Sequence, residues 1–150
     1  MSRPGLRVKP AMTAVLLAMA GTAFAQSTPV GLWHNIDDKT GEARAAVRIG
    51  EAGGVLSGRI EKLLRKDKAD AVCSECTDDR KDKPVVGMEI IRGARASDTE
   101  PGAWTGGKIL DPDNGREYTL RLVPLEGGKR LQVRGYLGPF YRTQTWVRVQ

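Results

Sequence analysis

Residues 26–150 predict an all-β fold, a single antiparallel up-and-down β-barrel of about eight strands. Three observations lead to this prediction. Apolar and polar residues alternate along several segments, turns rich in glycine and aspartate separate those segments, and no stretch shows three turns of helical apolar spacing. Successive hairpins close most simply into a barrel, because closure leaves no strand edge exposed; a sandwich of two sheets is the alternative.

The clearest strands alternate with a period of two residues, as half-buried antiparallel strands do. They cover residues 43–50, 54–63, 116–122 and 129–137, and further strands are predicted around Trp33, Ile90 and Trp104 and over residues 143–149. Asn114-Gly115 is the strongest hairpin signal between them, because both residues tolerate positive φ. The longest irregular segment, between Glu61 and Pro84, contains both cysteines.

Residues 1–25 predict an export signal, with a basic start followed by an apolar run that ends on Ala23-Phe24-Ala25. The run spans about 15 residues, whereas a membrane-spanning helix needs about 20. Cleavage near Ala25 would leave residues 26–150 as one domain in the periplasm of a bacterium or secreted, with no transmembrane segment. Three positive charges leave with the signal, so the formal net charge falls from +6 to +3. This charge and the export argue against a nucleic-acid partner.

Gly31-Leu32-Trp33 at the start of the first strand and Thr145–Val149 at the end of the last resemble the calycin superfamily of lipocalins and fatty-acid-binding proteins. The resemblance implies that an arginine of the last strand lies over the indole of Trp33 and closes one end of the barrel. Arg148 is the expected arginine, ahead of Arg142. The contact would be a cation–π interaction that also covers apolar surface.

A second resemblance extends over nearly all of residues 31–149. "GLWHNIDDKTGEARAAVRI", "AVCSEC", "KPVVGMEIIRG", "WTGGKILDPDNGREY" and "VRGYLGPFYRTQTWVRV" are similar to exported bacterial proteins of family number 2147 among the domains of unknown function. The resemblance implies an exported lipocalin-like barrel. It implies no activity and supplies no catalytic residues.

The two cysteines, Cys73 and Cys76, stand at C-x-x-C spacing. An exported protein favours a disulfide between them, and the acidic side chains around them, such as Glu75 and Asp78, oppose a reactive thiolate. A metal or dimer-bridging site and a redox centre are the alternatives. No metal and no cofactor are predicted, because zinc normally takes four ligands and the chain has one distant histidine.

No group of residues predicts catalysis. His34 is the single histidine and directly follows Trp33 on a strand, where a solvent-facing position is expected. The sequence therefore predicts a non-enzymatic protein that binds a small apolar molecule or an envelope component in or at the mouth of the barrel. The residues expected to line the interior are Val47, Ile49, Leu56, Ile60, Tyr118, Leu120, Val133 and Leu137.

The alternative is a protein–protein interaction module with a barrel filled by side chains. Its surface would be residues 135–144, which hold Tyr136, Phe140, Tyr141 and Arg142, together with the loop that holds the two cysteines, because aromatic residues beside an arginine are typical interface anchors. Neither the ligand, the partner nor the oligomeric state follows from the sequence.

Overall fold

The computed structural model describes residues 2–5, 10–11 and 27–150. The strands are β1 (Gly31–Ile36), β2 (Ala43–Ala52), β3 (Val55–Leu63), β4 (Glu89–Ala96), β5 (Trp104–Asp111), β6 (Arg116–Leu125), β7 (Arg130–Leu137) and β8 (Phe140–Arg148), with short 3-10 helices η1 (Lys66–Lys68) and η2 (Glu126–Gly128). The predicted export signal, residues 1–25, lies almost entirely outside the described residues and stays a prediction.

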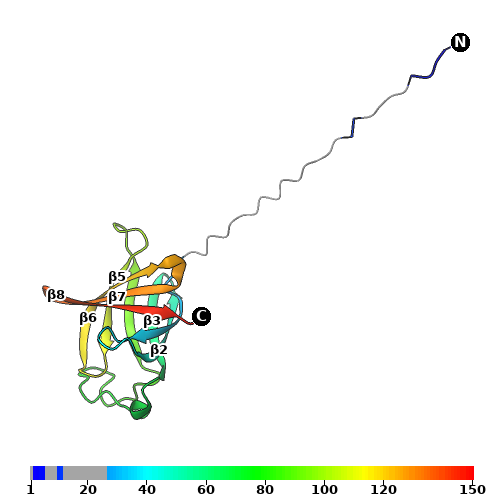
Figure 1. Cartoon of the computed structure of the whole chain (residues 1–150). Helices are drawn as coiled ribbons and strands as arrows, with labels where there is room; N and C mark the ends of the chain where they lie inside the picture. Colours follow the sequence, from blue (N-terminus) through cyan, green and yellow to red (C-terminus); the bar gives the residue numbers. More distant parts are fainter. Residues whose placement is uncertain (1, 6–9, 12–26) are drawn as a thin grey trace.

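The eight strands form a closed barrel in which each strand pairs with its neighbour in the chain and β1 pairs with β8 (Figure 1). Every pairing is antiparallel. The all-β, up-and-down barrel that the alternation predicts is therefore confirmed, and the sandwich alternative is wrong. Closure follows from the alternation, since each strand has one apolar face and a barrel directs all eight inward.

The seam between β1 and β8 is short. Only Trp33 with Arg148 and His34 with Val147 are paired there, whereas the β7–β8 ladder runs from Arg130 to Phe140. A register shift interrupts the β1–β2 ladder between Asn35 and Ile36. Since no residue of β8 before Val147 pairs with β1 in the described part of the chain, the first half of β8 continues without β1 as a partner, and the β7–β8 hairpin projects from the barrel at the left of Figure 1.

The connections divide between two ends of the barrel. One end holds the β2–β3, β4–β5 and β6–β7 turns, and the other, which we call the loop end, holds the β1–β2, β3–β4, β5–β6 and β7–β8 connections. The β3–β4 connection, residues 64–88, is the longest and carries η1; it is drawn in green at the bottom of Figure 1. An isolated bridge between Val72 and Pro84 closes this connection on itself.

Buried side chains pack closely in the half of the barrel that lies away from the loop end, and the core cluster continues from there to Cys73, Cys76 and Val85 at the loop end. Its largest fully buried side chains include Trp33, Ile49, Leu56, Ile91, Leu120, Leu122 and Leu131. Glycines admit these side chains: a Cβ at Gly58 would lie 3.0 Å from Ile91, and one at Gly107 would lie 2.5 Å from the backbone nitrogen of Ala94. Small residues on the strands thus allow close packing in this half instead of leaving space. None of the helices in the described residues is long and apolar enough to span a membrane.

Candidate ligand-binding site

The loop-end half of the barrel contains a cavity of about 160 Å³. Strands β1 to β8 contribute its wall, together with Arg65 and Val85 of the β3–β4 connection and the β5–β6 turn. The apolar part of the wall includes Ile60, Leu63, Val85, Ile90, Val133 and Trp146. Polar and charged side chains gather toward the loops. The cavity therefore has an apolar floor on the packed core and a polar mouth, an arrangement common in sites for small molecules.

The residues predicted to line the interior divide into three groups. Ile60, Tyr118 and Val133 line the cavity. Val47, Ile49, Leu56 and Leu120 are buried in the packed core. Leu137 was expected inside, but its side chain is 45% exposed, because it lies at the end of β7 in the projecting hairpin. The alternation assigned the inward face correctly along β7 but could not show where the barrel ends.

Ion pairs connect the loops that surround the mouth of the cavity. Arg44 pairs with Asp37 at 3.3 Å and also with Asp113, and Arg65 pairs with Asp113 at 3.3 Å. Backbone N–H groups of Thr40 and Lys39, with Arg44 nearby, keep the pKa of Asp37 below its ordinary value. These pairs link the β1–β2, β3–β4 and β5–β6 connections around one rim.

Arg142 closes the same rim from β8. Its Nε donates to the carboxylate of Asp38 at 3.0 and 3.1 Å, and Nη2 binds the same carboxylate. The hydrogen bonds to Arg142 lower the pKa of Asp38. Arg142 was predicted as a residue of an interaction surface; the structure places it on the cavity wall as well.

Residues 69–83 of the β3–β4 connection, which we call the cysteine loop, pack beside this mouth. Cys73 and Cys76 form a disulfide with a Cα–Cα distance of 5.4 Å, and both side chains are buried in the core cluster. The disulfide that the sequence favoured over a metal site or a redox centre is therefore present. A Cβ on Gly115 would overlap the carbonyl oxygen of Glu75, so the β5–β6 turn lies directly against this loop. In the described part of the chain, no cluster of three or more metal-ligating side chains is present.

Arg80 anchors the cysteine loop to the barrel wall, and its side chain is only 5% exposed. Nη1 donates to the carbonyl oxygen of Glu89 at 2.9 Å, and Nη2 pairs with Glu117 at 3.2 Å. Nε donates to both carboxylate oxygens of Asp78 at 3.1 Å. One guanidinium thus joins the loop to the start of β4 and the start of β6. No sequence pattern indicated this role, since Arg80 lies in a run of charged residues typical of solvated loops.

Trp33 and Arg148 lie at the opposite end of the barrel. The guanidinium carbon of Arg148 is 4.2 Å from the centre of the Trp33 ring. Arg148 also donates to the carbonyl oxygens of Val30 at 2.8 Å, of Thr28 at 2.6 Å and of Gly128. Trp33 Nε1 donates to the carbonyl oxygen of Pro29 at 2.8 Å. The expected partner arginine is thus Arg148, while Arg142 lies at the loop end.

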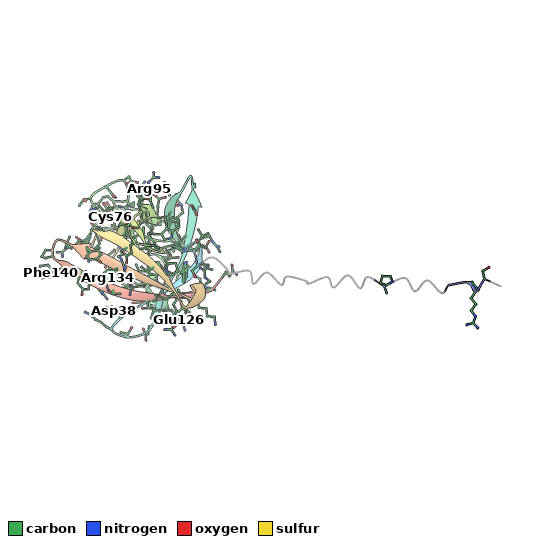
Figure 2. The ribbon with its side chains drawn as sticks, turned by 90° about the horizontal axis from the view of Figure 1, so that it is seen from above. Asp38, Cys76, Arg95, Glu126, Arg134 and Phe140 are labelled. Carbon is green, nitrogen blue, oxygen red and sulfur yellow. A yellow bond between two sulfur atoms is a disulfide. The ribbon has the colours of Figure 1, made fainter. Side chains whose placement is uncertain are left out.

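The β7–β8 hairpin carries the other predicted surface. Phe140 is 76% exposed and Tyr141 is 62% exposed, and Phe140 stands at the outer tip of the molecule in Figure 2. Tyr136 and Tyr141 pack with ring centres 5.7 Å apart, and Arg134 lies 4.6 Å from the centre of the Tyr141 ring. Tyr136 and Tyr141 therefore form an aromatic pair on one face of the hairpin, whereas Phe140, the residue before Tyr141 in β8, points to the other face together with Leu137.

Several cavity residues were missed by the sequence reasoning. Trp146 is fully buried and lines the cavity, and Arg44, Arg65 and Asp113 form its mouth. Trp146 shares its inward parity with Gln144 and Arg142, so alternation along β8 could have identified it. The charged rim had no such signal, because arginines on strands and aspartates in turns are ordinary surface residues.

The profile of a bacterial protein family matches residues 31–148, and the family is described as uncharacterized protein conserved in bacteria (DUF2147). The chain belongs to this family. Among solved structures, the protein HP1028 from Helicobacter pylori, described as belonging to the lipocalin family, superposes with a TM-score of 0.67 at 15% identity, over 81% of this chain and 82% of that chain. At this identity the likeness shows a shared lipocalin-like fold. No curated protein matches the chain.

Proposed function

We propose that this DUF2147 protein is an exported, non-enzymatic protein that binds a small, largely apolar molecule in the cavity at the loop end of its barrel. The observation that carries the proposal is the cavity of about 160 Å³ with an apolar floor and a polar mouth. Barrels of eight strands have room for side chains or for one small ligand. Here side chains fill the half away from the loop end and leave a cavity of about 160 Å³ in the other half.

The lining supports binding rather than catalysis. Among the described residues that line the cavity, there is no serine, cysteine or histidine. His34 pairs with Ala46 and Val147 at the β1–β8 seam and is not part of the cavity wall. A hydrolytic site would need a nucleophile and a base within hydrogen-bond reach of each other, and this wall supplies neither of the common pairs.

The disulfide supports export. Disulfides persist in oxidising compartments such as the periplasm and are rare in the cytosol. Cys73 and Cys76 are joined in the structure, and residues 1–25 have the composition of an export signal. We therefore place the function in the periplasm or outside the cell.

Toluene is a suitable probe, since an engineered cavity of about 150 Å³ in another protein binds benzene. We expect toluene to shift the indole N–H resonance of Trp146, whose Nε1 donates to Gln144 at 3.0 Å beside the cavity. The indole resonance of Trp33, buried at the far end, should move much less and serves as the internal control. Native mass spectrometry of protein purified from its own envelope should then reveal a bound small molecule. Equal small shifts at both indoles would contradict a ligand in this cavity.

A second candidate function is self-association through the hairpin, favoured by the free edge of β8. Arg148 N–H donates toward β7 and Val149 N–H toward β1, so by alternation the N–H groups of Thr145, Thr143 and Tyr141 point toward the β1 side. No described strand pairs there beyond Val147. Open edges of this kind accept a further strand. A second copy fits, because the outward side chains at these three positions are uncharged.

This alternative predicts a dimer in sedimentation-velocity experiments, with the two β8 strands antiparallel. Thr145→Pro should abolish the dimer without unfolding the monomer, because the lost N–H does not face β7. Circular dichroism checks that the variant keeps its strands. A wild-type protein that stays monomeric up to high micromolar concentration would contradict this candidate.

A further inference from the structure

We propose that the ligand of this cavity is small and electrically neutral, with an apolar body and one head group that both donates and accepts hydrogen bonds, as an alcohol or a primary amide does. The inference rests on the proposed function and adds the size and chemical class of the ligand. It follows from the volume of the cavity, from the pairing of every arginine at its mouth and from two unpartnered polar atoms in its wall.

The volume limits the size of the ligand. The cavity holds about 160 Å³, and an engineered cavity of about 150 Å³ in another protein is filled by benzene. A body of roughly six to eight non-hydrogen atoms therefore fits. A long acyl chain would have to displace the packed side chains of Leu56 and Ile91 or extend through the mouth into solvent.

The mouth has no spare positive charge for an anionic head group. The arginines of the wall are each paired: Arg44 with Asp37 and Asp113, Arg65 with Asp113, and Arg142 with Asp38. A carboxylate on the ligand would have to displace one of these aspartates and would gain only the same type of pair. Because each arginine of the wall already has a carboxylate partner, the mouth disfavours an anionic ligand.

A cationic head group meets a different obstacle. Asp111 is the remaining carboxylate of the wall, and it accepts the backbone N–H of Asp113 at 2.9 Å. Asp111 also attracts Arg142, whose pKa is raised first by its hydrogen bond to Asp38 and further by Asp37 and Asp111. An ammonium placed at Asp111 would lie near that guanidinium, and like charges at short range are unfavourable.

Two polar atoms of the wall lack hydrogen-bond partners within the described residues. They are Oδ1 of Asn35, an acceptor, and Nε of Arg65, a donor, and both are buried. Asn35 of β1 is paired with Ala45 of β2, and Ala45 is paired with Leu63 of β3, two residues before Arg65. The polar groups of Asn35 and Arg65 therefore border the same part of the mouth. A buried polar atom without a partner destabilises the protein, so a ligand that supplies the missing partner gains affinity. A head group with both a donor and an acceptor can satisfy either atom, whereas a carboxylate has no donor for Asn35 and an ammonium no acceptor for Arg65.

A matched series of six-carbon probes tests the inference: 1-hexanol, hexanamide, hexanoate and hexylammonium, titrated into the mature protein at neutral pH. The shift of the Trp146 indole resonance gives each dissociation constant. We expect the two neutral probes to bind at least about tenfold more tightly than either charged probe, a difference of about 1.4 kcal/mol. Equal or tighter binding of hexanoate or hexylammonium overturns the inference. If toluene binds and the four probes do not differ, the proposed function stands and this inference fails; if no probe binds, both fail.

Asp38→Asn separates charge pairing from general effects of shape. The substitution leaves the guanidinium of Arg142 without its carboxylate, so hexanoate should bind about tenfold more tightly than to the wild type while 1-hexanol changes little. Asp79→Asn is the matched control, because it breaks the ion pair of Asp79 with Arg92, and neither of these residues lines the cavity. Unchanged hexanoate binding by D38N would show that the paired arginine does not exclude anions.

Discussion

Replacing Arg148 with alanine is expected to lower the free energy of unfolding by about 3 kcal/mol. The substitution removes the cation–π contact with Trp33, at 4.2 Å, and leaves the carbonyl oxygens of Thr28, Val30 and Gly128 without this donor. A cation–π contact contributes about 0.5–2 kcal/mol and a hydrogen bond from a charged donor about 1.5–3 kcal/mol. Burial lowers the pKa of Arg148, and this desolvation cost offsets part of the sum.

Urea denaturation followed by tryptophan fluorescence measures this effect. Arg148→Lys keeps the charge but loses the planar fork that reaches several carbonyls at once, so it should restore only part of the stability. Arg130→Ala is the matched control, because Arg130 lies on the neighbouring strand and makes only an exposed pair with Glu126. A loss below about 1 kcal/mol for Arg148→Ala would mean that the pair does not hold this end of the barrel.

The sequence was sufficient to predict the barrel because the pattern that specifies it is local. Alternation over residues 43–50 or 129–137 shows which face of a strand is apolar, and the turns show where the chain reverses. Eight such strands with hairpin connections have few ways to bury their apolar faces. The fold was therefore predictable, although the alternation did not indicate that the β1–β8 seam has only two paired positions.

The cavity was harder to predict because it depends on how far each interior side chain reaches. Leu56 and Ile60 share the inward parity of β3, yet Leu56 packs in the core and Ile60 lines the cavity. Alternation shows whether a side chain of a strand faces the interior, but not how far along the barrel axis it lies. The predicted lining was therefore partly core, partly cavity wall and, at Leu137, outside.

The charged mouth could not be predicted, because its pairs join distant parts of the chain. Arg142 and Asp38 are separated by 104 residues, and Arg44 and Asp113 by 69. Each residue alone has the ordinary role of a strand arginine or a turn aspartate. Their pairing appears only when the barrel brings four connections to one end, and this pairing determines which head groups the mouth admits.

Arg80→Met is expected to destabilise the cysteine loop and to lower the free energy of unfolding by about 2–3 kcal/mol at neutral pH. Methionine fills a similar volume but cannot donate to the Glu89 carbonyl or pair with Asp78 and Glu117. The estimate lies below that for a fully buried ion pair, because the two carboxylates are partly exposed and become hydrated. Lys81→Met, at an exposed neighbouring side chain, is the matched control and should change stability little.

The pH dependence of the free energy of unfolding tests the role of Arg80 independently. Side-chain hydrogen bonds from Arg80, with the Arg80 backbone N–H, lower the pKa of Asp78 from 3.8 to about 2. A carboxyl group whose pKa is lower in the folded state stabilises the fold above its unfolded pKa, and this contribution is lost as the pH falls from about 4 to about 2. Since the Asp78 side chain is 34% exposed, solvent screening limits the contribution to about 1 kcal/mol. Urea denaturation at several pH values should give a shallower loss of stability between about pH 4 and pH 2 for Arg80→Met than for the wild type. Parallel curves would show that the Arg80 side chain does not stabilise the Asp78 carboxylate, because Arg80→Met removes the largest cause of the lowered pKa and keeps only the backbone N–H of residue 80 as a donor.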